Sequence, residues 1–211
     1  MRDTFPKKGI YAISPPFKQG NGYLEKIEAS IKAGVVALQI REKKYLQTAS
    51  FIDLLKHIRK LCYEYNVNLI INDSVKIAKK LSCGVHLGKN DMNLVSARQQ
   101  MGKNAFIGIS CYNSSLNAFE SARQGANYVA LGSFFSSKTK PDALTCKLSE
   151  LQKLKGKLSI PVVAIGGITN TNAKLIIDNG ADLVAVSSYI YSGIDPWNSV
   201  KNLQKIINEA G

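Results

Sequence analysis

The sequence predicts a single α/β domain over residues 1–211, a (β/α)8 TIM barrel of parallel strands. Short apolar runs rich in β-branched residues recur at intervals of roughly 20 to 30 residues, and there are eight of them. Longer segments with helical spacing lie between these runs, as in folds whose strands and helices alternate around a parallel sheet. A hydrophobic content of 45% over 211 residues can fill one sizeable core, although the length alone would also allow a second domain. In such a barrel the active site is expected at the carboxyl ends of the strands.

The elements follow in order along the chain. The expected strands are residues 9–14, 35–40, 68–73, 84–88, 105–110, 127–132, 161–167 and 183–188. The segments between them, such as LEKIEASIKAG, TASFIDLLKHIRKLCYEY, NAFESARQGA, TNAKLIIDNGA and PWNSVKNLQKIINEA, place apolar residues at helical spacing. Asn72-Asp73, taken alone, is typical of an N-cap for a helix over VKIAKK. A dinucleotide-binding fold is the weaker alternative, because no G-x-G-x-x-G opens a helix and no Walker motif occurs.

The net charge and its distribution limit the kinds of molecule that the protein is expected to bind. The chain has 28 Lys and Arg against 15 Asp and Glu, a net charge of +13, which would suit a nucleic acid, a membrane surface or an anionic substrate. The basic residues are dispersed, without a run of five, and this favours solvated surface lysines over a nucleic-acid-binding tract. No apolar stretch approaches twenty residues, so we expect no membrane span. The oligomeric state is left open, and a homo-oligomer is allowed.

The cysteines and histidines indicate the cellular compartment and whether a zinc site is expected. The four cysteines show no C-x-x-C spacing, and the first residues, MRDTFPKK, lack the apolar core of a secretory leader. We therefore expect a cytoplasmic protein with reduced thiols. Only two histidines occur, His57 and His86, which argues against a zinc site built from His and Cys.

Polar residues recur where the expected strands end. Gln39, Arg41 and Lys43 alternate with apolar or acidic neighbours, and their period of two aims all three the same way if the strand extends that far. The other strand ends contribute Asn72 and Asp73, Asp91, Ser110, then Ser137, Thr139 and Lys140, the pair Gly166-Gly167, and Ser187 with Ser188. Each has a plainer explanation as a turn, cap or solvated residue, but their joint occurrence at one end of the barrel predicts a binding site.

Charge indicates what this mouth would bind. Arg41, Lys43 and Lys140 supply three cations, and Asp73 and Asp91 supply hard oxygen ligands. That combination suits a polyphosphate carrying Mg²⁺, because the metal bridges carboxylate and phosphate oxygens. A diphosphate that is stabilised as a leaving group points to transfer of the group it leaves behind.

A second phosphate belongs at the glycine pair. Gly166-Gly167 follows a strand and lets backbone N–H groups approach a ligand, and with Ser187 and Ser188 it makes the phosphate cradle common after strands seven and eight of such barrels. The sequence thus predicts two phosphorylated small-molecule substrates, a metal-bound diphosphate and a monophosphate.

These residues lie in a series of motifs that resembles the thiamine-phosphate synthase (thiamin phosphate pyrophosphorylase) family. The motifs, in the order of that family, are QIREK, IIND, GVHLGKND, IGIS, GSFFSSKTKPDA, PVVAIGGIT and GADLVAVSS. They run from about Gly9 to the last helix, so the resemblance covers nearly the whole chain.

The resemblance implies a transferase of thiamine biosynthesis. The family joins 4-amino-2-methyl-5-hydroxymethylpyrimidine diphosphate to 4-methyl-5-hydroxyethylthiazole phosphate and releases diphosphate, through a pyrimidine methyl cation that the thiazole nitrogen captures. It implies catalytic roles for Arg41, Lys43 and Lys140, and Mg²⁺ on Asp73 and Asp91. Matched by motif, the pyrimidine diphosphate would bind at Gln39, Arg41, Lys43, Asn72, Ser110 and Lys140, and the thiazole phosphate at Ser137, Thr139, Gly167, Ser187 and Ser188.

The chain departs from the family pattern at three places. Many relatives read IINDR where this chain has IINDS, so Ser74 supplies no cation. The frequent T-x-T-K appears as Ser137-Lys138-Thr139-Lys140, which keeps a hydroxyl at the first position. Ser187 replaces a residue that is often aliphatic, so at that position the backbone N–H is the more secure donor.

Three other functions remain as alternatives. A thiazole tautomerase of the same superfamily shares the barrel but typically uses a histidine just after strand five, where this chain has Cys111 and Tyr112. A non-catalytic barrel that binds phosphorylated ligands would not need Arg41, Lys43 and the two aspartates together. A nucleic-acid binder would need a basic tract with interleaved aromatic residues, which the sequence lacks.

Overall fold

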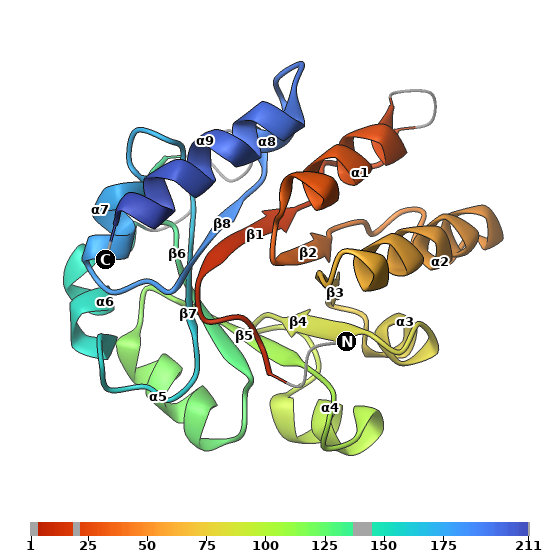
Figure 1. Ribbon diagram of the computed structural model, residues 1–211. Helices are drawn as coiled ribbons and strands as arrows, with labels where there is room; N and C mark the ends of the chain where they lie inside the picture. The colour runs from red at the N-terminus through yellow and green to blue at the C-terminus, as the bar shows by residue number, and fades with distance from the viewer. Residues whose placement is uncertain (1–3, 19–21, 137–144, 211) are drawn as a thin grey trace.

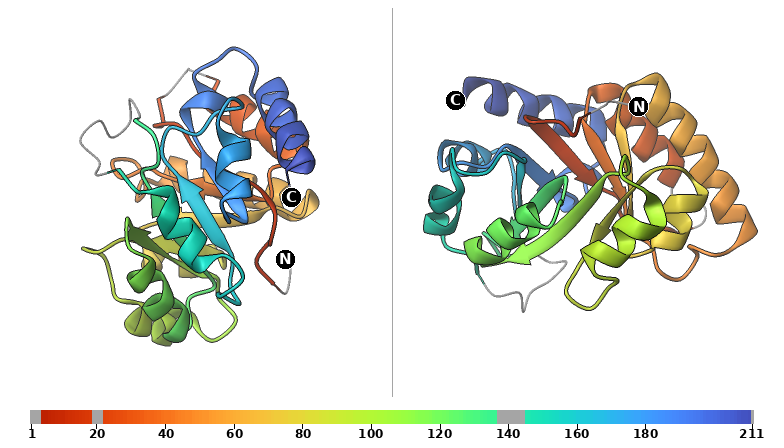
Figure 2. Two further views of the ribbon diagram at one scale, coloured as in Figure 1. Left: turned by 90° about the vertical axis from the view of Figure 1, so that its left-hand side faces the viewer. Right: turned by 90° about the horizontal axis from the view of Figure 1, so that it is seen from below.

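The computed structural model describes residues 4–18, 22–136 and 145–210, and its eight parallel strands pair in sequence order into a closed barrel (Figure 1). The predicted TIM barrel is therefore confirmed. The strands are β1 Gly9–Ile13, β2 Ala37–Ile40, β3 Asn68–Asn72, β4 Gly84–Leu87, β5 Ile107–Tyr112, β6 Tyr128–Gly132, β7 Val162–Ile165 and β8 Leu183–Val186. The helices, which surround the strands (Figure 2), are α1 Tyr23–Ala33, α2 Ala49–Glu64, α3 Val75–Lys80, α4 Leu94–Met101, α5 Ser115–Arg123, α6 Leu148–Leu154, α7 Ala173–Asp178, α8 Ser188–Tyr191 and α9 Pro196–Glu209.

The structure decides two conditional points about local structure. Strand β2 ends at Ile40, as the expected strand 35–40 does, so Arg41 and Lys43 lie in the loop that follows and do not share the direction that a longer strand would give them. The N-cap of α3 is Ser74, whose hydroxyl accepts a hydrogen bond from the amide of Ile77 at 3.4 Å, and not Asn72-Asp73. The residue that departs from the family's IINDR pattern thus begins the helix.

The barrel separates two apolar cores. The larger one lies between the strands and the helices, and the smaller one fills the barrel with alternate strand residues such as Tyr11, Ile70 and Tyr128. Gly108 on β5 faces inward, where a Cβ atom would overlap the ring of Tyr128. A glycine at this position therefore lets one large ring occupy the centre of the barrel.

The amino end of the barrel is closed by the segment before β1. The ring of Phe5 stacks on Tyr128 with centroids 4.1 Å apart, and it meets Phe106 edge-on at 5.7 Å. Lys8 Nζ donates to the carbonyl oxygen of Ala210 at 3.2 Å, which ties this segment to the end of α9. The inner core is thus sealed at the end of the barrel opposite the expected site.

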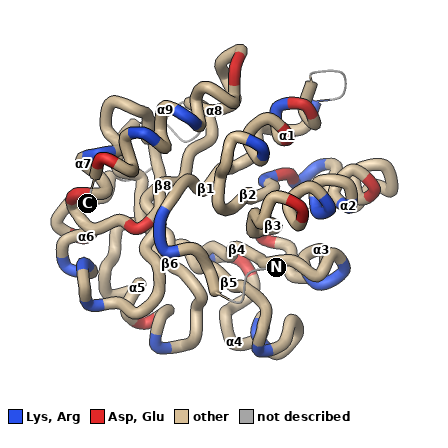
Figure 3. Tube along the Cα trace, viewed as in Figure 1, with Lys and Arg blue, Asp and Glu red and all other residues tan. Residues whose placement is uncertain are grey.

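Surface charge follows the expected dispersed pattern. Lysine and arginine occur on helices all round the barrel in Figure 3, interspersed with acidic residues. No helix in the described part of the chain is long and apolar enough to cross a membrane.

Candidate active site

A layer of polar side chains lies inside the barrel above the aromatic core, toward the carboxyl ends of the strands. Gln39 Nε2 donates to Asn72 Oδ1 at 2.7 Å, joining β2 to β3. His86 Nε2 and Ser110 Oγ are 2.9 Å apart, joining β4 to β5. Three of these four were predicted as site residues, and the structure places them on neighbouring inward-facing positions.

The fourth residue of this layer, His86, was not predicted to belong to the site. Its Nδ1 atom lies 3.1 Å from the hydroxyl of Tyr128, which in turn lies 2.8 Å from the hydroxyl of Tyr11. In sequence, His86 stands in an apolar strand motif and gives no local signal of a polar role. Its side-chain contacts on β5 and β6 come from residues far away in the chain.

The loop after β2 is held by a buried carboxylate. Glu42, which is 8% exposed, accepts hydrogen bonds from the amides of Phe17 at 3.1 Å, Lys44 at 2.7 Å and Tyr45 at 3.3 Å. These bonds turn the chain directly after Ile40, which explains why the strand does not continue. The loop presents Arg41 and the exposed Lys43 at the mouth from a defined backbone.

The two predicted metal-binding carboxylates lie at the ends of β3 and β4. Asp73 has a left-handed backbone conformation with φ 64°, and its Oδ2 atom is 3.2 Å from Lys43 Nζ. Asp91 Oδ2 accepts from the amide of Gly88 at 2.7 Å. Burial, and after it the neighbouring carboxyl of Asp73, raise the pKa of Asp91, while the Gly88 amide acts in the opposite direction.

This pair fits a hard divalent cation. Two neighbouring negative carboxylates would be stabilised by a cation between them, and Mg²⁺ in substrate sites is commonly held by one or two carboxylates together with phosphate oxygens. Within residues 4–18, 22–136 and 145–210, no group of three or more His, Cys, Asp or Glu side chains is placed to hold a metal ion. A site built on Asp73 and Asp91 would thus depend on the substrate for its remaining ligands.

The glycine pair after β7 permits a close approach, and in this structure the approaching segment is the chain after β6. A Cβ atom on Gly166 would lie 2.6 Å from Ser133 Cα, and one on Gly167 would lie 2.5 Å from the carbonyl oxygen of Ser136. Gly167 also has φ 61°. The pair therefore packs the start of the SSKTK segment against β7, in addition to any ligand it receives.

The remaining predicted residues are only partly placed. Ser187 and Ser188 follow β8 and begin the one-turn helix α8, beside the glycine pair in barrel order. Ser137, Thr139 and Lys140 lie outside the described residues.

Strand β5 ends differently from the tautomerase pattern. Cys111 is fully buried in the outer core, and Tyr112, with φ 54°, points its hydroxyl to the amide of Lys89, which donates to it at 3.1 Å. The same hydroxyl would lie 3.2 Å from a Cβ atom on Gly88, so Tyr112 supports the turn that carries Asp91. This supporting role was missed, because nothing in the local sequence links Tyr112 to that turn.

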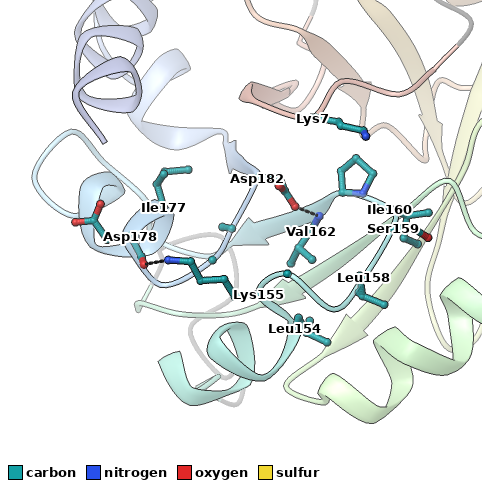
Figure 4. A pocket seen from close by; sticks show the side chains of 14 residues that line it. Lys7, Leu154, Lys155, Leu158, Ser159, Ile160, Val162, Ile177, Asp178 and Asp182 are labelled. Atoms are coloured by element: carbon teal, nitrogen blue, oxygen red, sulfur yellow. Dashed lines mark hydrogen bonds between the residues drawn. The ribbon is translucent and has the colours of Figure 1, made fainter. Parts of the chain in front are cut away.

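A hollow of the described surface lies away from these residues. It measures about 500 Å³ and is lined by residues such as Lys155, Val162, Asp178 and Asp182 at the amino ends of β7 and β8 (Figure 4). None of the predicted site residues lines it. Chemistry and fold position, and not the size of the hollow, identify the site.

The chain is similar to known proteins of one family over most of its length. A family model described as thiamine monophosphate synthase matches residues 10–190. The chain is 40% identical over 200 residues to the thiamine-phosphate synthase of Methylococcus capsulatus, covering 94% of this chain and 89% of the relative. It is 37% identical over 205 residues to that of Nitrosomonas eutropha, covering 97% and 96%.

A solved structure, thiamine phosphate pyrophosphorylase from Pyrococcus furiosus, superimposes with a TM-score of 0.84 at 31% identity, covering 96% of both chains. The matched residues 10–190 include seven of the strands in full and all but the first residue of β1. The chain belongs to the thiamine monophosphate synthase family.

Proposed function

We propose that this protein is a thiamine-phosphate synthase, a transferase that joins 4-amino-2-methyl-5-hydroxymethylpyrimidine diphosphate to 4-methyl-5-hydroxyethylthiazole phosphate and releases diphosphate. The support is the family match over residues 10–190 together with one observation of geometry. The Lys43 ammonium lies 3.2 Å from one of two neighbouring carboxylates, and a layer of hydrogen-bonded polar side chains lies inside the barrel near the same strand ends. This order suits a substrate with a neutral ring at one end and a diphosphate at the other.

Each group of residues has a separate task in this proposal. Gln39, Asn72 and Ser110 bind and orient the pyrimidine, whose electron-rich ring stabilises the positive charge that develops as the diphosphate leaves. Arg41 and Lys43 bind the diphosphate oxygens, on which negative charge accumulates in the transition state. Because the β2 loop is held by Glu42, these cations need little rearrangement to do so.

Other residues of the proposal come from the family resemblance. Lys140 would bind the diphosphate from the opposite side, and Ser137 and Thr139 would contact the thiazole phosphate together with Gly167, Ser187 and Ser188. We further propose that residues 1–211 act as one domain, since the paired strands close a single barrel.

Asp73 and Asp91 would hold Mg²⁺. When bound, the ion neutralises charge on the diphosphate and favours its departure. The Gly88 amide orients Asp91, and the left-handed backbone at Asp73 points its carboxylate across to the loop of Lys43.

The direct test is incubation of the purified protein with both substrates and Mg²⁺, with separation of thiamine phosphate and measurement of diphosphate. Both products should appear in equal amounts, and omission of either substrate should abolish both. Diphosphate release without thiamine phosphate would contradict the proposal, as would the absence of turnover in folded protein.

Lys43 and its neighbour offer a matched pair of variants. We expect Lys43→Ala to lower kcat/KM by roughly 10²-fold, the scale for one charge-stabilising donor. Lys44→Ala should stay within about twofold, because Lys44 Nζ lies 5.1 Å from the ring of Tyr45 and the backbone amide of residue 44, which bonds Glu42, is retained. Steady-state kinetics with both substrates varied distinguishes the two, and equal losses would show that the loop as a whole is damaged.

A further inference from the structure

Four side chains from four strands form a continuous hydrogen-bonded row inside the barrel. The Tyr11 and Tyr128 hydroxyls are 2.8 Å apart, Tyr128 lies 3.1 Å from His86 Nδ1, and His86 Nε2 lies 2.9 Å from Ser110 Oγ. The row begins in the aromatic core and ends at the proposed pyrimidine site.

The two tyrosines keep their protons. Burial raises the pKa of Tyr11 and of Tyr128, so both are neutral phenols at neutral pH. Each hydroxyl therefore carries one donor that needs an acceptor.

The hydrogen bond of Tyr11, at the inner end of the row, determines the direction of donation along the whole row. In the described part of the chain, the Tyr11 hydroxyl has one hydrogen-bond partner, the Tyr128 oxygen, and its ring is packed near that of Phe5. The proton of Tyr11 must therefore be donated to Tyr128, and the proton of Tyr128 is then donated to His86 Nδ1. With Nδ1 accepting, the neutral imidazole carries its proton on Nε2 and donates it to Ser110.

The reverse direction leaves a buried donor without an acceptor. If Ser110 donated to His86, Nδ1–H would donate to Tyr128, Tyr128 would donate to Tyr11, and the Tyr11 proton would point into apolar side chains. The penalty for such a group corresponds to roughly a 10- to 100-fold preference for the forward direction.

We propose that Tyr11 and Tyr128 hold His86 as the neutral Nε2–H tautomer, and that His86 thereby makes Ser110 a hydrogen-bond donor that selects an acceptor atom on the substrate. His86 is a positioning residue in this scheme and transfers no proton. The identity of the substrate rests on the proposed function. Because Ser110 lies in the polar layer that the proposed function assigns to the pyrimidine, the acceptor belongs to the pyrimidine ring, where a ring nitrogen offers a lone pair.

The tautomer can be read directly. A long-range ¹H–¹⁵N correlation spectrum of the ¹⁵N-labelled protein contains two imidazoles, His86 and the exposed His57, and the signals are assigned with a His57→Gln variant. We expect a pyridine-like Nδ1 and a pyrrole-like Nε2 for His86. An Nδ1–H tautomer or an imidazolium at neutral pH would overturn the proposal, whether or not the protein makes thiamine phosphate.

Two phenylalanine variants test the inner end. Tyr128→Phe removes the donor to Nδ1, so His86 should shift toward a mixture of tautomers. Tyr11→Phe also removes one buried hydroxyl, but Tyr128 must still donate to His86, so the Nε2–H tautomer should remain. A loss of the tautomer in Tyr11→Phe but not in Tyr128→Phe would contradict the proposed direction.

Kinetics separates positioning from proton transfer. We expect His86→Leu to raise KM for the pyrimidine diphosphate roughly fivefold, the scale of one neutral hydrogen bond, with little change in kcat. In His86→Gln the amide carbonyl can accept from Tyr128 and the amide N–H can donate to Ser110, so most of that loss should be recovered. A 10²-fold fall of kcat in His86→Gln would indicate acid–base catalysis by the imidazole and would overturn the positioning role.

Discussion

The two ends of the barrel use the same residue types in opposite ways. At the amino end, Asn127 and Asp182 precede β6 and β8, and each accepts the first amide of the preceding strand, from Ile107 at 2.8 Å and from Val162 at 2.7 Å. At the carboxyl end, Asp73 and Asp91 follow β3 and β4, and Asp73 is paired with the side chain of Lys43, which is 82% exposed. An Asp or Asn side chain that accepts a strand amide thus stabilises the barrel. One that has no strand amide as a partner remains available to a ligand.

Basic side chains also differ between the two ends, since Arg98 at the amino end is held by backbone carbonyl groups whereas Lys43 is exposed at the mouth. Arg98 donates to the carbonyl oxygens of Gly102, Lys103, Ala105 and Gly125 and to Asn127 Oδ1, so one guanidinium joins two loops at the amino end. Substitutions at the two ends should therefore separate stability from activity.

The largest effect should come from the carboxyl end. We expect Asp73→Asn and Asp91→Asn each to lower kcat/KM by at least about 10²-fold, because a metal ion supplies several kcal/mol of charge stabilisation and 1.36 kcal/mol is a factor of ten. Asparagine tolerates the left-handed backbone of residue 73. Both variants should melt at or above the wild-type temperature, because one of two neighbouring negative charges is gone.

Enzyme kinetics over a range of Mg²⁺ concentrations, with melting followed by circular dichroism, measures both effects. EDTA should stop the wild type until Mg²⁺ is restored. Full activity in EDTA-treated, metal-free buffer would contradict the role of this pair.

A smaller effect, of the opposite kind, is expected at the amino end. Arg98→Ala should cost about 2 kcal/mol of unfolding free energy and lower the melting temperature by roughly 4–8 °C, since several carbonyl groups lose their donor. Activity at 25 °C should stay within about twofold. Arg123→Ala is the control, because that exposed arginine pairs with Glu120 on the same helix and should leave the melting temperature nearly unchanged. Equal melting temperatures for both variants would show that the Arg98 contacts contribute little.

The smallest effect is expected at Asp182. Burial raises its pKa, although the Val162 amide and Lys7 act in the opposite direction. A carboxyl whose pKa is higher in the folded state binds more protons there, so its ionisation reduces stability as the pH rises through that pKa. Asp182→Asn keeps an oxygen for Val162 and should therefore raise the unfolding free energy at pH 7 by no more than about 1 kcal/mol.

This advantage should shrink as the pH falls toward the pKa of an unfolded aspartate, about 3.9. Melting curves of both proteins between pH 4 and 8 test the sign. A variant that is less stable than the wild type at pH 7 would show that the charge on Asp182 stabilises the fold.

The barrel was predictable because its signal is local and repeated. Each apolar run is long enough to form a buried strand, and all eight were placed. Short helices were harder, since α4, α6 and α8 offer at most about two turns of periodicity. The alternation of Gln39, Arg41 and Lys43 left open whether β2 continues past Ile40. The strand does not continue, because the carboxylate of Glu42 accepts hydrogen bonds from the amides of Phe17 and Lys44, which the alternating pattern does not reveal.

For the candidate site, the position of polar side chains at the strand ends could be predicted from the sequence. The residues that hold those side chains in place could not. Gln39, Asn72, Asp73 and Asp91 follow from position in a parallel barrel. The roles of His86 and Tyr112 depend on contacts between different strands and loops, which only the folded structure brings together. The sequence also did not reveal that the glycine pair packs closely against the chain after β6, which is a second reason for glycine at these positions.

The hydrogen bond between Lys8 and Ala210 has a consequence for how the protein can be attached to other objects. It places both ends of the described chain at the amino end of the barrel, facing away from the mouth. A flexible linker of ten residues spans only about 16–19 Å on average. Short fusions or surface tethers at either end should therefore leave the mouth open to small molecules, so immobilised or tandem forms of the protein can be built without redesigning the barrel.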